Sequence, residues 1–196
     1  MHGIYKRTVA PTATPITTAE AKTQCAIASG IEDHDDYIDA LIDRATEAIE
    51  KHCNIQMLSA TWTLVLDTFP TEIVIVKPPV TAISSIGYTD TSGTAQTLSA
   101  SAYQTSLSTE FAPARIKPAV GYNWPNTQTD AYEAVTVTFT CGYAEAADVP
   151  LTLKHAVAFL VAHWFRNRES VADRTISKIP DGLEMLLSLE DWGAYA

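Results

Sequence analysis

Apolar residues in the first third of the chain recur at helical spacing. Between residues 34 and 53 they follow the i, i+3, i+4, i+7 rule of one buried stripe: Ile38, Leu41, Ile42, Ala45, Ala48, Ile49 and Cys53. Aspartates gather at the start of this segment, where the helix dipole favours negative charge. Thr17 or Thr18 can cap the first helix, and Thr17 stands three residues before Glu20, which is the spacing of a capping box. The pattern therefore predicts helices at residues 17–28 and 34–53, the first ending at Ser29 and Gly30.

The middle third changes to the alternation that is typical of β-strands. Trp62, Leu64 and Leu66 alternate with more polar residues, and an apolar–threonine alternation runs over residues 135–140. Shorter candidate strands are residues 73–76, 83–88, 102–106 and a segment near Arg115, with a turn at residues 90–93. Valine and threonine favour strands because branched side chains fit a pleated surface. We expect a β-rich antiparallel insertion at about residues 59–143.

The last third returns to helical spacing. Pro150 suits the first turn of a helix that we expect at residues 151–167. Its apolar residues cover more than one face, so this helix is either central to the core or buried on a second side by another subunit. A polar stretch then leads to a short predicted helix at residues 183–189. The order of helices, strands and helices predicts an α+β fold and not a parallel sheet.

The domain organisation that we expect is simple. Residues 1–16 lack periodicity and contain two prolines, so we predict an extended N-terminal arm. The rest, residues 17–190, is predicted to form one domain, since 196 residues that are 46% hydrophobic can build one core. The stripes of the helices at 17–28, 34–53 and 151–167 would supply that core. No apolar run is long enough to span a membrane, and residues 1–15 do not resemble a signal peptide, so we expect synthesis in the cytoplasm.

Charge is distributed unevenly along the chain. The net charge is −10, and no basic footprint for nucleic acid is present in the sequence as a whole. Residues 20–53 hold nine acidic and three basic residues, whereas a cluster near the C-terminus is basic. Solvated helix faces would explain much of this. A head-to-tail contact between copies would also use it, and its candidate residues are Asp39, Asp43, Glu47, Arg166 and Arg168.

Signatures of catalysis and of metal binding are missing from the sequence. It contains no GxSxG, GxxxxGK[ST], GxGxxG or HExxH motif. His52 and Cys53 are adjacent on a predicted helix and point in different directions, and His155 lies about 12 Å from His163 along another. The aspartates of residues 33–39 lack the glycine that a calcium loop needs. We therefore predict no catalytic residues, metal or cofactor, and an enzyme with an unrecognised site is the alternative from another class.

Short motifs occur in a characteristic order over residues 15–190. They are ITTAEAK (16–22), ATEAIEKHC (45–53), TWTL (61–64), KPPV (77–80), IGYTD (86–90), WP (124–125), VTVTFTCGY (135–143), HWFRNRE (163–169) and IPDG (179–182). In this order and spacing the chain resembles the head–tail connector (adaptor) proteins of tailed phages, which also occur in phage-derived gene transfer agents.

The resemblance implies a structural role in the virion, at the head–tail interface. It implies a small helical bundle with a β-rich insertion, assembled as a homo-oligomeric ring, usually of twelve copies, below the portal protein. Such a ring extends the DNA channel and receives tail-completion (stopper or terminator) proteins. The family has no catalytic residues to carry over. Another tail-completion or tail-tube subunit is the alternative within the virion.

Two further expectations concern portal and DNA. The apolar C-terminal segment would dock onto the portal through Leu183, Leu186, Leu187, Trp192 and Tyr195, or else fold back on its own domain. DNA would pass through the lumen without sequence-specific binding, because an acidic chain repels a polyanion. We expect a mostly acidic or neutral lumen, with at most a sparse basic ring from Arg166, Arg168 and Arg174.

Overall fold

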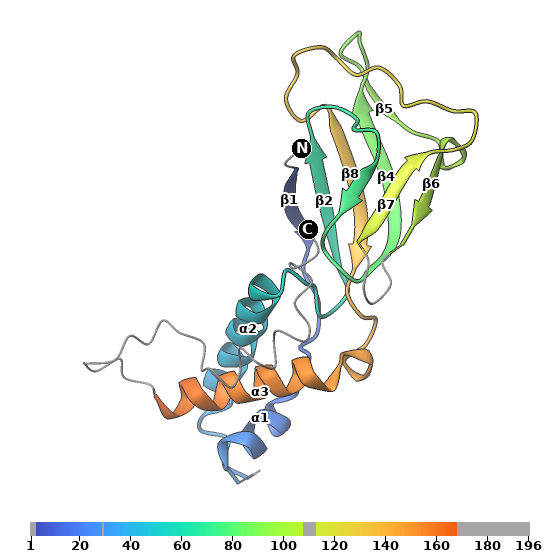
Figure 1. The fold of residues 1–196 in the computed structure, drawn as a ribbon. Helices are drawn as coiled ribbons and strands as arrows, with labels where there is room; N and C mark the ends of the chain where they lie inside the picture. The colour runs from blue at the N-terminus through green and yellow to red at the C-terminus, as the bar shows by residue number, and fades with distance from the viewer. Residues whose placement is uncertain (1–2, 29, 108–112, 168–196) are drawn as a thin grey trace. The chain divides into compact units, whose positions relative to one another are not determined.

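The computed structural model of the protein describes residues 3–28, 30–107 and 113–167. These residues form two compact units (Figure 1). The helical unit contains residues 12–58 and the segment that follows residue 142, and the β unit contains the N-terminal segment up to Pro11 together with residues 59–142. The β-rich insertion was predicted at about residues 59–143, inside one domain of residues 17–190. In the structure this insertion has a core of its own, because its strands bury their apolar faces against each other.

The helical unit contains α1 (Thr18–Cys25), α2 (Asp35–His52) and α3 (Leu151–Arg166), with a short 3₁₀ turn at Ala146–Asp148. Thr17 caps α1 as predicted: its side-chain oxygen accepts from the Glu20 N–H at 3.2 Å. The Glu20 carboxylate in turn accepts from the Thr17 N–H at 2.7 Å. This hydrogen bond to the charged form lowers the pKa of Glu20.

Helix α1 ends earlier than the predicted residue 28. Ala26 adopts a left-handed conformation with φ 60°, and Ile27 donates back to the Lys22 carbonyl at 2.9 Å. This closure turns Ile27 towards the helical core, so apolar burial ends the helix before Ser29 and Gly30 are reached. Helix α2 ends at His52, close to the predicted residue 53, and Asn54 beyond it is left-handed with φ 53°.

The core of the helical unit is built from the three predicted helices. Helix α1 contributes Ala21 and Cys25, and α2 and α3 contribute most of the rest. The buried residues of α2 and α3 are Ile38, Leu41, Ile42, Ala45, Ile49, Leu153, Ala156, Val157, Leu160, Val161 and Ala162. The predicted stripe of residues 34–53 is thereby confirmed. None of the described helices combines the length and the apolar composition that crossing a membrane would require.

Two antiparallel sheets make up the β unit (Figure 1). The larger sheet has the order β1-β2-β8-β4-β5, and the smaller has the order β3-β7-β6. Their strands are β1 (Ile4–Val9), β2 (Ala60–Leu66), β3 (Ile73–Ile75), β4 (Val80–Thr89), β5 (Ala95–Thr97), β6 (Tyr103–Ser106), β7 (Ala114–Pro118) and β8 (Val135–Cys141). Strand β8 lies at the centre of the larger sheet and buries every second residue, which explains its clear alternation in the sequence.

The expected α+β fold class is confirmed by three helices and two antiparallel sheets among the described residues. Two strands were not predicted. The arm expected at residues 1–16 is extended, but its residues 4–9 form β1, which pairs with β2 at the sheet edge. Tyr5 also joins β1 to the residue after β3, since its hydroxyl accepts from the Val76 N–H at 3.1 Å. Strand β5 is short and fully exposed, so it shows no alternation. The helix predicted at residues 183–189 lies outside the described residues.

Candidate assembly surfaces

The outer face of α2 carries the acidic residues that were predicted to meet a neighbouring copy. Asp39, Asp43 and Glu47 are exposed and four residues apart, so they lie along one side of the helix. Asp39 accepts a hydrogen bond from the Thr18 hydroxyl at 2.6 Å, and Glu47 pairs with Lys51 at 2.6 Å. Asp43 has no ion pair or hydrogen bond with another described residue. We call these three residues the acidic row.

The basic residues of the predicted contact are placed only in part. Arg166 is exposed in the last turn of α3, and within the described ranges it forms no ion pair. It lies near Cys25. Burial raises the pKa of the Cys25 thiol, and the positive charge of Arg166 offsets part of this rise. Arg168 lies outside the described residues, as do the predicted portal-docking residues Leu183, Leu186, Leu187, Trp192 and Tyr195. The acidic row and Arg166 therefore occupy different helices of one unit without neutralising each other.

Other charged side chains of the helical unit form hydrogen bonds and ion pairs within that unit. The Glu50 carboxylate is buried, with 6% of the residue exposed. It accepts from the Gln56 amide at 2.6 Å and from the Met57 N–H at 2.8 Å. Lys22, also buried, forms an ion pair with Asp35 that joins α1 to the start of α2. These side chains explain part of the acidic character of residues 20–53 without any partner molecule.

Helix α3 has an outer face that the sequence analysis did not assign. Leu151, His155 and Phe159 are exposed, and 80% of Leu151 is accessible to solvent. A helix exposed on one side normally carries charged residues there. The signal was present in the sequence, because the apolar residues of this segment cover more than one face. Which of them would lie outside could be decided only once the packing of α1 and α2 was known.

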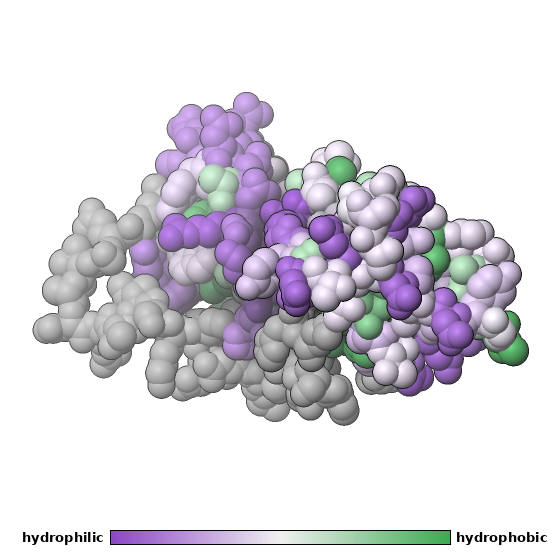
Figure 2. Space-filling model, turned by 90° about the horizontal axis from the view of Figure 1, so that it is seen from above, coloured by the Kyte–Doolittle hydropathy of each residue, from purple (hydrophilic) through white to green (hydrophobic). Residues whose placement is uncertain are grey.

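The β unit presents a different kind of surface. Residues 1–11 and 59–142 hold six acidic and five basic residues, whereas the rest of the chain holds 17 acidic and eight basic residues. The face drawn in Figure 2 shows apolar residues as scattered spots and not as one broad patch. Almost all of the net negative charge therefore belongs to the helical unit and its C-terminal extension.

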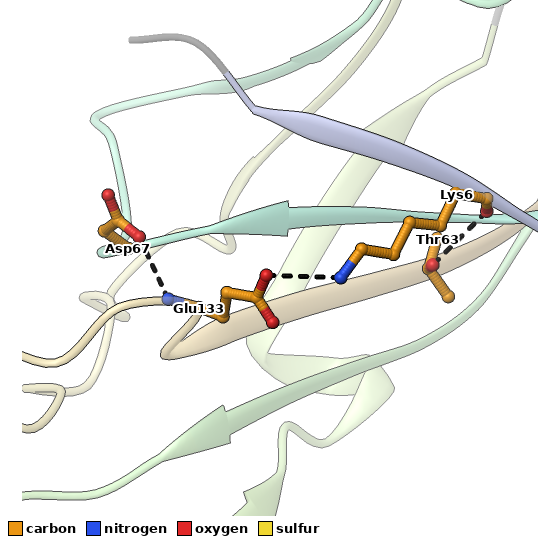
Figure 3. A network of polar contacts seen from close by, with 4 residues as sticks. All are labelled: Lys6, Thr63, Asp67 and Glu133. Carbon is orange, nitrogen blue, oxygen red and sulfur yellow. Dashed lines mark hydrogen bonds and ion pairs between the residues drawn. The ribbon is translucent and has the colours of Figure 1, made fainter.

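The long loop between β7 and β8 covers one end of the β unit. Its residues 124–131 line, with residues 67–69 and Thr91, an open hollow of about 700 Å³. Phe69 stacks on Trp124 there, with ring centroids 4.8 Å apart. Figure 3 shows how the end of the loop is tied down: Glu133 pairs with Lys6 of β1 at 3.2 Å, and its N–H donates to Asp67 at 2.9 Å. These contacts are exposed and polar, and they hold the loop against the edge of the sheet.

The described residues bring together no arrangement suited to catalysis or metal binding. Among them, no three His, Cys, Asp or Glu side chains gather as metal ligands would. His52 is exposed while Cys53 is buried, so this adjacent pair does not converge. The three cysteines are buried and form no disulfide.

Comparison with known proteins agrees with this description. A family model of head completion proteins matches residues 15–178. A chain from the neck of an empty GTA particle, computed with C6 symmetry, superposes with a TM-score of 0.77 at 21% identity, over 95% of this chain and 94% of that chain. A chain from the virion of a native gene transfer agent (GTA) particle gives a TM-score of 0.77 at 20% identity, with the same coverage of both chains.

A chain from the neck of a native GTA particle, computed with C12 symmetry, gives a TM-score of 0.70 at 18% identity, over 95% of this chain and 93% of that chain. No curated protein matches the sequence. The structural matches establish the shared fold, and the family model, which spans most of the sequence, establishes the relationship. The chain therefore belongs to the head completion protein family, and its role is structural and not enzymatic.

Proposed function

We propose that this protein is a head–tail connector subunit that forms a ring, of twelve copies, in the virion or phage-like particle. The ring would lie at the head–tail interface, between the portal protein and the tail-completion proteins, and would extend the DNA channel. Membership of the head completion family supports this role. The similar chains come from particle necks computed with C6 and C12 symmetry, which supports a ring of this order.

The contact that closes the ring would be heterologous, with a different face of each copy on either side. The observation that carries this proposal is the separation of charge within the helical unit. The acidic row lies on α2, whereas the sequence of α3 contains no acidic residue and ends in Arg166, which forms no ion pair with another described residue. One copy would set its acidic row against Arg166 and Arg168 of the next. Exposed charge pairs contribute only about 0–1 kcal/mol each, so they would fix register more than strength.

A charge swap tests this contact. Arg166→Glu should weaken self-association at low salt, and Asp43→Arg in the same chain should restore it, because the two charges would again be opposite across the interface. Lys117→Glu, which reverses an exposed charge on the β unit, is the matched control and should assemble like the original protein. Native mass spectrometry over a concentration series gives the oligomer distribution. If neither single reversal, R166E or D43R, changes the oligomer distribution, the proposed pairing of Arg166 with the acidic row is excluded.

The charge of the β unit bears on the proposed passage of DNA. This unit is nearly neutral, while the helical unit and its extension are strongly acidic. A lumen lined by either unit would let DNA slide, since tight binding needs several clustered cations per site. Contact with the portal would fall to the C-terminal segment that contains Leu183, Leu186 and Trp192. Co-purification of the full chain with portal protein, compared with a chain truncated after Lys178, tests that assignment.

A further inference from the structure

The two sides of α3 differ in what covers them. Leu153, Val157 and Leu160 belong to the helical core, packed against α1 and α2. Leu151, His155 and Phe159 lie on the opposite side, since each residue advances about 100° around the helix and these three span about 80°. They form a line about 12 Å long. We call Leu151, His155 and Phe159 the outer stripe of α3.

The outer stripe is apolar where a solvated face should be charged. Leu151 is 80% exposed, Phe159 is 39% exposed, and neither belongs to the core of the unit. Ala158, which is small and partly buried, lies beside the stripe, where a neighbouring helix can approach closely. The exposed face of α2 in the same unit carries charges, as expected for contact with water. The stripe is therefore a place where removal from water would be favourable.

The charges around the stripe indicate what covers it. Helix α3 has no acidic residue, and Lys154 and Arg166 are basic residues flanking the stripe. The outer face of α2 offers the complement, because the acidic row runs along it. Ala40 is exposed on that same side, four residues after Asp36 and three before Asp43. Because its side chain is small, a large apolar side chain can approach the helix between these two carboxylates.

We propose that the outer stripe of α3 in one copy packs on the outer face of α2 in the next copy. Phe159 and Leu151 are the apolar anchors of this contact, with Phe159 over Ala40. His155 and Arg166 face the acidic row. The proposal rests on the ring proposed above and identifies the surface that supplies its binding energy. The charges would then set the register of a contact whose strength comes from the two anchors.

Cross-linking tests where the stripe lies in the assembled protein. The full chain carrying the photo-reactive residue p-benzoylphenylalanine at Phe159 is mixed with ¹⁵N-labelled original chain and irradiated. We expect cross-links from position 159 to heavy-isotope peptides of residues 35–52, which can come only from a second copy. Cross-links confined to light peptides of the same chain, including those after residue 167, would overturn the proposal, because the protein would then be covering its own stripe.

Substitution tests whether the anchors matter for assembly. The double variant L151S/F159S should keep its fold, because both side chains are exposed, and should lower the association constant at least tenfold. The matched control Val120→Ser changes an exposed apolar residue of the β unit and should leave association unchanged. A chain that stays monomeric at every concentration contradicts the ring and this surface together. A ring that R166E weakens but L151S/F159S does not would contradict this surface alone.

Discussion

The buried carboxylate at the end of α2 gives the sharpest prediction about stability. Glu50 lies in the last turn of the helix, where the dipole disfavours a negative charge. The donors that keep it there include the Gln56 amide at 2.6 Å and the Met57 N–H at 2.8 Å. Both Gln56 and Met57 are fully buried. The carboxylate therefore holds residues 53–57 against the end of the helix.

Replacing Glu50 by alanine removes the carboxylate that accepts from both of these donors. Each unsatisfied buried donor costs about 1–3 kcal/mol. Alanine recovers a few tenths of a kcal/mol through helix propensity and up to about 1 kcal/mol through the dipole. We therefore expect a net destabilisation of about 2–4 kcal/mol. In a unit of this size that lowers the melting temperature by on the order of 10–25 °C. Glu50→Gln retains one acceptor oxygen, so its melting temperature should lie between those of the original protein and E50A.

Thermal unfolding followed by circular dichroism at 222 nm measures the effect, because the helical unit dominates that signal. Glu47→Ala is the matched control, since Glu47 lies on the same helix, is exposed and pairs with Lys51 at 2.6 Å. Such an i,i+4 pair is worth about 0.3–0.5 kcal/mol, so E47A should barely move the transition. If E50A loses no more stability than E47A, the buried network contributes nothing and the reasoning is refuted.

Four further predictions concern the helical core, the turn at Asp90, the C-terminal segment and the net negative charge. Leu41→Ala and Leu160→Ala, each in the helical core, should cost about 2–5 kcal/mol by thermal melt; two unchanged melts would contradict this core. Hydrogen bonds from Ser92, Gln96 and Thr94 hold the pKa of Asp90 well below its usual range. The stability that ionised Asp90 contributes is therefore complete above about pH 3.9 and is lost as pH falls towards its lower folded-state pKa. The variant D90N should lose less stability over this acid range than the original protein, and an unchanged dependence of stability on pH would refute this. Truncation after Lys178 should leave a folded chain that no longer joins portal, whereas an unfolded product would indicate that the segment packs on its own domain. A gel shift with duplex DNA at moderate salt should show no sub-micromolar binding. Such binding would contradict the prediction that DNA passes through the lumen without being bound tightly.

The regular elements of this fold could be predicted where one face is buried. Helix α2 shows its stripe because the whole helix packs on α1 and α3, and β8 shows its alternation because it is central. Strand β1 could not be predicted, since it is an exposed edge whose partner lies more than fifty residues away. The early end of α1 follows from the burial of Ile27, a tertiary contact that no local signal at Ser29 and Gly30 reveals.

The candidate surfaces were predictable only in part. The acidic row was evident because charges at i, i+4 spacing must share a helix face. The outer stripe of α3 was not, because its apolar residues are of the same kind as those of the core and differ only in what packs on them. Leu151 and Leu153 stand two residues apart in the sequence, yet one is exposed and the other buried. Periodicity shows that a second face exists, and the structure decides which residues form it.

Cryo-electron microscopy of particles that contain this protein is the most direct test of its proposed role. We expect one ring of copies between the portal and the tail-completion proteins, with the outer stripe of α3 against α2 of the adjacent subunit at every interface. Location of the chain in the tail tube, or as isolated copies without contact between α3 and α2, would rule out this role and this contact.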